Sequence, residues 1–161
     1  MEVVLVKKGW KTLLICIAIP LAVGGLSAWL TRGSMEAFEQ MNKPPLAPPG
    51  WLFPVVWTIL FVLMGVASYL VYTSGEKQAD VERALRVYIL QLVVNFFWSI
   101  LFFNLSLCFA AFVWLILLWA LVLVTLVRFY RITPYAGYLL VPYVLWVTFA
   151  GYLNLSICLL N

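Results

Sequence analysis

Long runs of apolar residues with almost no charge recur five times in this chain of 161 residues. A helix that crosses a bilayer needs roughly 20 consecutive, mostly apolar residues. A composition of 66% hydrophobic and 10% charged residues is foreign to soluble globular domains of this size. The sequence therefore predicts an all-α integral membrane protein, a bundle of five transmembrane helices that forms one domain over residues 1–161. The expected helices cover about residues 9–30, 51–73, 85–104, 106–130 and 135–159.

A proline-rich strap, which we define as residues 42–50, lies between the first two expected helices. Its four prolines are Pro44, Pro45, Pro48 and Pro49. Each proline fixes φ and biases the preceding residue toward extended backbone, so the strap cannot be helical and need not be floppy. Trp51 and Pro54 follow at the start of the second helix, where a missing N–H removes little. The alternative interpretation is a rigid loop whose tryptophans only anchor the membrane interface.

The positive charges near the span ends are distributed unevenly. With five spans, one side of the membrane carries eight basic residues: Lys7, Lys8, Lys11, Lys77, Arg83, Arg86, Arg128 and Arg131. The other side carries Arg32 and Lys43. Because the side richer in Lys and Arg stays in the cytoplasm, we expect a cytoplasmic N-terminus and an external strap. The expected location is a bacterial plasma membrane, crossed several times.

Several kinds of chemistry are excluded or disfavoured by residue type. The chain has no histidine, which rules out a Ser–His–Asp arrangement, a histidine metal site and an axial histidine for haem. All six carboxylates lie in expected tails or loops, so no ionisable residue marks an ion path inside a span. We expect no metal, no required cofactor and no nucleic-acid partner. Cys16, Cys108 and Cys158 lie singly in apolar runs, and we expect small buried hydrophobes rather than disulfides.

Polar and aromatic residues share one face on three of the expected helices, at about 100° per residue. The faces are Pro54, Trp57, Phe61, Gly65 and Ser68; then Tyr88, Gln91, Asn95, Trp98, Ser99 and Phe102; and then Tyr143, Trp146, Ala150, Leu153 and Asn154. An amide exposed to lipid costs on the order of several kcal/mol, so Gln91, Asn95 and Asn154 should point inward. Interhelical hydrogen bonding, worth about 0.6 kcal/mol each, is the favoured role for Gln91 and Asn154. For Asn95 that role and pocket lining stay equally open. A cavity with flat aromatic walls and a few amides suits a planar, mostly apolar ligand.

Three segments carry a resemblance to a known family. They read NKPPLAPPGWLFPVVW over residues 42–57, QLVVNFFW over residues 91–98 and PYVLWVTFAGYLN over residues 142–154. In this order and within five spans, they resemble the tryptophan-rich sensory protein / translocator protein family, also called the peripheral benzodiazepine receptor family. The resemblance implies a five-helix bundle that binds porphyrins such as protoporphyrin IX beneath the loop between the first two helices, usually as a homodimer. The sterol-linked motif, a Tyr followed by a basic residue near the end of the last helix, is incomplete here.

The resemblance also implies site residues. By position, ten residues would line the ligand pocket: Trp51, Phe53, Trp57, Phe61, Asn95, Trp98, Phe102, Tyr143, Trp146 and Ala150. We therefore expect a membrane porphyrin-binding sensory or regulatory protein that mediates light-dependent degradation of protoporphyrin IX, with Trp51 and Trp146 as the photochemical residues. Its partners would be the porphyrin, membrane lipid and a second copy of the chain. The alternatives are a transporter or channel for porphyrins or other planar apolar solutes, and a structural bundle without a small ligand. No conventional acid–base, nucleophilic or metal site supports ordinary catalysis.

Overall fold

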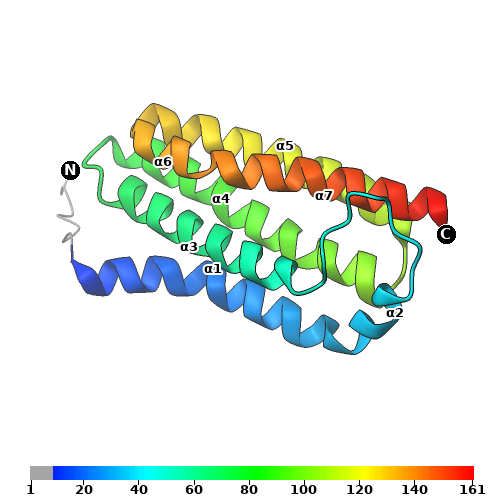
Figure 1. The fold of residues 1–161 in the computed structure, drawn as a ribbon. Coiled ribbons are helices and arrows are strands. Elements are labelled where there is room, and N and C mark those ends of the chain that lie inside the picture. Colours follow the sequence, from blue (N-terminus) through cyan, green and yellow to red (C-terminus); the bar gives the residue numbers. More distant parts are fainter. Residues whose placement is uncertain (1–8) are drawn as a thin grey trace.

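Five long helices form an antiparallel bundle in the computed structural model, which describes residues 9–161 (Figure 1). They are α1 (Trp10–Thr31), α3 (Leu52–Tyr72), α4 (Gln78–Ser99), α5 (Cys108–Ile132) and α7 (Val141–Leu160). All five belong to segments that are long and apolar enough to cross a membrane, and the described residues contain no strand. The predicted all-α bundle of five membrane-spanning helices is confirmed. Lys7 and Lys8, used above to predict the orientation, lie outside the described residues.

Four shorter elements refine the predicted boundaries. They are η1 (Arg32–Ser34), α2 (Met35–Glu39), the π-helical segment η2 (Ile100–Asn104) and α6 (Pro134–Leu139). The predicted start of the third helix at about residue 85 is wrong, because α4 already begins at Gln78. Charged residues can extend a helix beyond the bilayer, because they pair with each other along its surface. In α4, Arg86 lies 3.9 Å from the carboxylate of Glu82, one turn earlier. Asp80 in the first turn also suits the positive end of the helix dipole.

Three helices, α4, α5 and α7, pack together through both apolar and hydrogen-bonded contacts. The indole Nε1 of Trp114 in α5 donates to the backbone oxygen of Val94 in α4 at 2.7 Å. The indole Nε1 of Trp119 in α5 donates to Oγ1 of Thr148 in α7 at 2.9 Å. Leu118 of α5 and Val147 of α7 are almost fully buried. The tryptophans of α5 therefore fasten this helix to its neighbours rather than contribute to the predicted inward faces.

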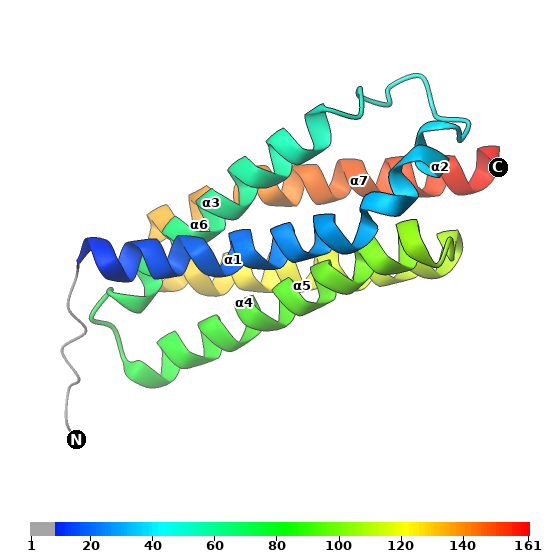
Figure 2. The ribbon, with the colours of Figure 1, turned by 90° about the horizontal axis from the view of Figure 1, so that it is seen from below.

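The remaining side of the bundle is built on a close approach of α1 and α3. A Cβ at Gly65 would lie 2.5 Å from the Cα of Ile17, so only glycine allows this contact. A Cβ at Gly24 would collide with the ring of Phe61, whereas Gly25 has open space around it. Figure 2 shows α1 lying between α3 and α4 in that view, with α7 behind. Toward the strap α3 diverges from α1, and residues of both helices border the space between them.

A disulfide between Cys108 and Cys158 contradicts the expectation of three unpaired cysteines. The bond joins the first residue of α5 to the last turn of α7, with the two Cα atoms 5.6 Å apart. The prediction failed because spacing along an apolar run says nothing about which helix ends meet in space. Cys16 is free and half-buried, as expected.

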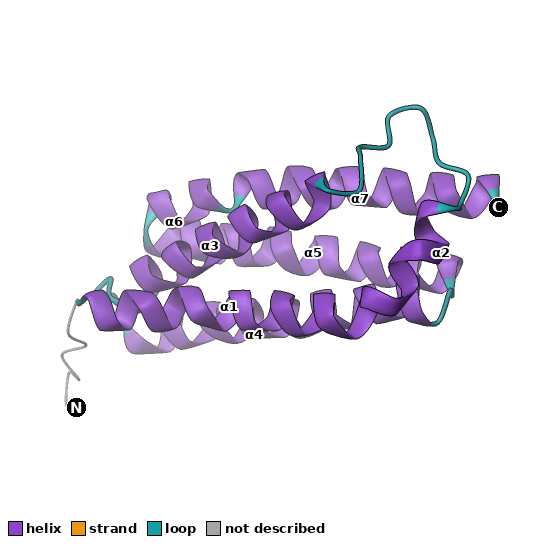
Figure 3. Ribbon diagram, turned by 60° about the horizontal axis from the view of Figure 1, so that its bottom comes forward, coloured by secondary structure: helices purple, strands orange, loops and turns teal. Residues whose placement is uncertain are grey.

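The strap itself is an extended loop at one end of the bundle. It leaves α2, passes beside the end of α7 and returns to the start of α3 (Figure 3). Pro44 is buried, while Leu46 is 70% exposed. The predicted non-helical conformation of the strap is confirmed, although the short helix α2 occupies part of the connection before it.

Candidate ligand-binding pocket

A cavity of about 730 Å³ lies beneath the strap, at the end of the bundle where the chain's last residue is found. Its walls come from α1, η1, α2, α3, α4, η2 and α7, and the strap contributes Gly50. Cavities that bind drug-sized ligands have volumes of about 300–1,000 Å³ and mostly apolar walls. Among the lining residues, only Arg32 and Glu39 carry charge. The cavity can therefore hold an apolar molecule but offers no deep acid–base group.

The structure brings together nine of the ten residues that sequence reasoning predicted for the pocket. Those lining the cavity are Trp51, Phe53, Trp57, Phe61, Asn95, Trp98, Phe102, Trp146 and Ala150. The tenth, Tyr143, is 1% exposed and lies behind the wall rather than in it. The helical faces were therefore predicted well, but a face alone does not reveal how deep each side chain lies. The ligand-binding role of these residues stays a prediction.

Flat aromatic pairs form two parts of the cavity wall. Trp57 and Phe61 of α3 stack with ring centroids 5.5 Å apart and an interplanar angle of 28°. Trp98 and Phe102 stack at 5.5 Å and 16°. Trp146 of α7 meets Trp57 edge to face, with centroids 6.5 Å apart. These surfaces match a planar ligand, because aromatic rings favour offset-stacked and edge-to-face contacts.

Asn95 connects the cavity to a buried chain of hydrogen bonds. Its Nδ2 donates to the Tyr143 hydroxyl at 2.7 Å, and that hydroxyl donates to Oε1 of Gln91 at 2.7 Å. Gln91 Nε2 in turn points at Sδ of Met64, 3.8 Å away. Gln91 does not line the cavity and fills the interhelical role favoured for it. Asn95 does both jobs, since it lines the cavity and joins α4 to α7.

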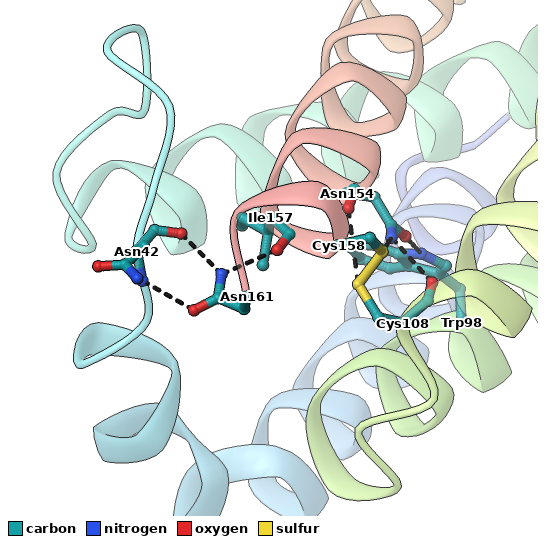
Figure 4. The surroundings of a disulfide bond; sticks show 7 residues. All are labelled: Asn42, Trp98, Cys108, Asn154, Ile157, Cys158 and Asn161. Atoms are coloured by element: carbon teal, nitrogen blue, oxygen red, sulfur yellow. Dashed lines mark hydrogen bonds between the residues drawn. A yellow bond between two sulfur atoms is a disulfide. The ribbon is translucent and has the colours of Figure 1, made fainter.

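Asn154 also combines a structural role with a place in the cavity wall. Its Oδ1 accepts a hydrogen bond from the indole Nε1 of Trp98 at 3.1 Å, and its Nδ2 donates to the backbone oxygen of Cys108 at 3.1 Å. Figure 4 shows this amide beside the disulfide of Cys108 and Cys158. Asn154 therefore fixes the orientation of one indole that faces the cavity.

The tryptophans predicted as photochemical residues have different surroundings. Trp51 lines the cavity at its mouth and is 67% exposed. Trp146 lies among aromatic rings, and its Nε1 is buried without a hydrogen-bond partner in the described part of the chain. An unpaired buried donor costs free energy unless a ligand supplies an acceptor. Trp146 is therefore the indole more closely integrated into the cavity.

Sequence reasoning missed the contribution of the short elements before the strap. Phe38 of α2 is buried, and its ring centroid lies 5.2 Å from that of Phe103. Arg32 lines the mouth with its guanidinium 4.9 Å from the ring centroid of Trp29. The predicted helices end near residue 30 and resume near residue 51, so the helix over residues 35–39 was not predicted. An aromatic residue within a helix-forming stretch (residues 35–39) was the available signal.

Comparison with known proteins identifies the family. The sequence profile described as the TspO/MBR family matches residues 16–160, which is almost the whole chain. The chain belongs to the TspO/MBR family. It is 40% identical over 151 residues to the tryptophan-rich protein TspO of Chlorobaculum tepidum, covering 93% of this chain and 96% of that protein.

More distant members of the TspO/MBR family match over a somewhat smaller share of the chain. The chain is 35% identical to the tryptophan-rich sensory protein of Cereibacter sphaeroides, covering 78% of this chain and 77% of that protein. It is 33% identical to the translocator protein of Bos taurus, covering 84% and 82% respectively. The resemblance seen in the three sequence segments is thus confirmed at the level of the family.

Proposed function

We propose that this TspO/MBR protein binds a porphyrin in the cavity beneath the strap and acts as a membrane sensory or regulatory protein for tetrapyrroles. The observation that carries the proposal is one cavity of about 730 Å³ whose wall holds two stacked aromatic pairs. A porphyrin is planar and largely apolar, so it would gain stacking and burial together in such a space. The Cereibacter sphaeroides relative is named a sensory protein, which supports a regulatory role.

We further propose that light-dependent degradation of bound protoporphyrin IX depends on the cavity tryptophans. An excited porphyrin needs an oxidisable group close by, and Trp146 lies within an aromatic cluster with its ring centroid 5.8 Å from that of Phe53. Trp51, at the mouth, is the second candidate. Ordinary acid–base catalysis has no support, since Arg32 and Glu39 are the only charged residues among residues 9–161 that line the cavity.

The strap and the cavity mouth are proposed to face the outside of a bacterial plasma membrane. The described basic residues Lys11, Lys77, Arg128 and Arg131 lie near the opposite end of the bundle. The disulfide lies at the strap's end, and such bonds persist in oxidising compartments rather than in the cytoplasm. Charge asymmetry and cysteine pairing are independent, and both support the same orientation.

Phenylalanine replacements separate porphyrin binding from photochemistry, because they keep a ring and remove the easily oxidised indole. In the dark, binding of protoporphyrin IX to the parent protein should quench tryptophan fluorescence. Trp146→Phe should retain most of the affinity for porphyrin in the dark. Under illumination, its porphyrin absorbance should decay much more slowly than in the parent protein. Trp51→Phe should slow this decay less. Unchanged turnover in both variants would contradict the photochemical role, and absence of quenching in the parent would contradict the binding site.

A further inference from the structure

One face of the last two turns of α7 fastens three other parts of the molecule. Asn154, Cys158 and Asn161 are spaced at i, i+4 and i+7, which places them on the same side of the helix. They contact α4, α5 and the strap in turn (Figure 4). The end of α7 thus joins the cavity wall, a neighbouring helix and the cover of the cavity.

The strap is held to the end of α7 by a reciprocal pair of amide hydrogen bonds. The backbone N–H of Asn42 donates to Oδ1 of Asn161 at 3.1 Å, and Nδ2 of Asn161 donates to the backbone oxygen of Asn42 at 2.9 Å. The Asn42 side chain adds a bond to the backbone oxygen of Leu160 at 3.4 Å. Within residues 9–161, no other side-chain hydrogen bond joins the strap to α3, α4, α5 or α7. We call this contact the asparagine clasp.

The disulfide fixes the helix end that carries the clasp. Cys158 lies three residues before Asn161, and its partner Cys108 begins α5. The Asn154 side chain contacts both halves of the bond, since Nδ2 donates to the Cys108 backbone oxygen at 3.1 Å and lies 3.4 Å from Sγ of Cys158. Helix ends fray readily when no tertiary contact holds them. Without the disulfide, no covalent bond would join the last turn of α7 to α5, and the Asn154 hydrogen bond to Cys108 would lie one turn before it.

The two cysteines differ in burial, which sets the order in which an external thiol would react with them. Cys158 is a buried residue, whereas Cys108 is only partly buried. A thiolate of an external dithiol would attack Sγ of Cys108, form a mixed disulfide and release Cys158 as the thiolate. The second thiol of the dithiol then resolves the mixed disulfide. In total the dithiol becomes a disulfide, and two electrons and two protons pass to the cysteine pair.

We propose that Cys108–Cys158 is a redox site that controls closure of the strap over the cavity, with a dithiol as its reductant. In the oxidised protein the anchored end of α7 holds the asparagine clasp and the cavity stays covered. Reduction frees the last turn of α7, opens the clasp and uncovers the mouth. The effect on a bound porphyrin rests on the proposed function, but the movement of the strap does not.

Hydrogen exchange of the full-length protein without porphyrin tests the redox site directly. Treatment with dithiothreitol should speed exchange in peptides covering residues 40–51 and 154–161 by about fivefold or more, the change expected when one hydrogen bond of ordinary strength is lost. Peptides of α6 and the α3–α4 turn, at the other end of the bundle, should not change. Thiol alkylation before and after reduction counts the cysteines that react. Equal exchange of the strap in both states, or free Cys108 and Cys158 in the untreated protein, would overturn the proposal.

Two variants test whether the clasp links the disulfide to the strap. In Asn161→Ala, strap exchange should already be fast and should no longer respond to dithiothreitol, while the disulfide still forms. Cys16→Ser is the matched control, because Cys16 lies on α1 outside the disulfide and should leave the response intact. A full response to dithiothreitol in Asn161→Ala would contradict the clasp as the link. Since no step uses porphyrin, failure of porphyrin binding leaves this result interpretable.

Discussion

Asn95 and Gln91 lie one turn apart on α4 and form hydrogen bonds with the same Tyr143 hydroxyl, yet their positions imply different roles. Asn95 donates to the Tyr143 hydroxyl and lines the cavity, whereas Gln91 accepts from that hydroxyl and is 1% exposed behind the wall. Loss of Asn95 leaves the hydroxyl its bond to Gln91. Loss of Gln91 leaves a buried O–H without its acceptor, which costs more than the bond itself contributes.

The pair of variants Asn95→Leu and Gln91→Leu should separate binding from stability. We expect Asn95→Leu to weaken porphyrin binding while lowering the free energy of unfolding by only about 0.6 kcal/mol, the usual value for a hydrogen bond inside a membrane protein. Gln91→Leu should cost about 1–3 kcal/mol of stability and leave the dissociation constant nearly unchanged. Thermal unfolding in detergent and porphyrin titration measure the two quantities. A large loss of melting temperature with unchanged affinity in Asn95→Leu would assign Asn95 to interhelical packing alone.

At the scale of helices, the distance between α1 and α3 sets one dimension of the cavity. The contact of Gly65 with the backbone of Ile17 brings these helices together, and Gly24 makes room for the ring of Phe61 in the wall. Both glycines act through the volume they leave free, as small residues commonly do between membrane helices.

Gly65→Ala should therefore destabilise the protein, and Gly25→Ala should not. The added methyl at position 65 meets backbone atoms of α1, which cannot rotate away, so we expect a loss of about 1–3 kcal/mol. At position 25 the added methyl meets open space, and a higher helix propensity should give a neutral or slightly favourable change. Thermal unfolding of both variants in the same detergent checks the difference. Equal melting temperatures would show that the helices separate freely at Gly65.

The same helices show what a sequence can and cannot predict. Hydropathy located all five spans, and helical periodicity placed residues such as Trp57 and Trp98 on the faces that surround the cavity. Charge misled the prediction at the start of α4, because charged residues in water extend a helix as readily as they end it. The pairing of Cys108 with Cys158 depends on which helix ends meet, and no local pattern contains that information.

At the scale of the whole molecule, the strap, the disulfide and the cavity mouth gather at one end of the bundle. The opposite end carries the α3–α4 turn and α6. The proposed orientation places the strap and the cavity mouth on the external side of the membrane. In that orientation, reductants outside the membrane would reach the disulfide and thereby change how firmly the strap is held.

Labelling from outside intact cells tests the orientation. Ala47→Cys in the strap, made together with Cys16→Ser, leaves one free thiol among the described residues because Cys108 and Cys158 are paired. We expect a membrane-impermeant maleimide to label this variant in intact cells. A parent carrying only Cys16→Ser is the control and should stay unlabelled. Labelling only after permeabilisation would reverse the orientation.

The most direct test of the central claim is to fill the cavity and measure porphyrin binding. Ala150 of α7 lines the cavity, and Ala110 of α5 is exposed on the outside of the bundle. In dark titrations of protoporphyrin IX followed by tryptophan quenching, Ala150→Phe should weaken binding at least about tenfold, a cost of about 1.4 kcal/mol. Ala110→Phe should bind as the parent does, and both variants should keep the parent's helical content. Parent-like affinity in a folded Ala150→Phe would show that the porphyrin does not occupy this cavity.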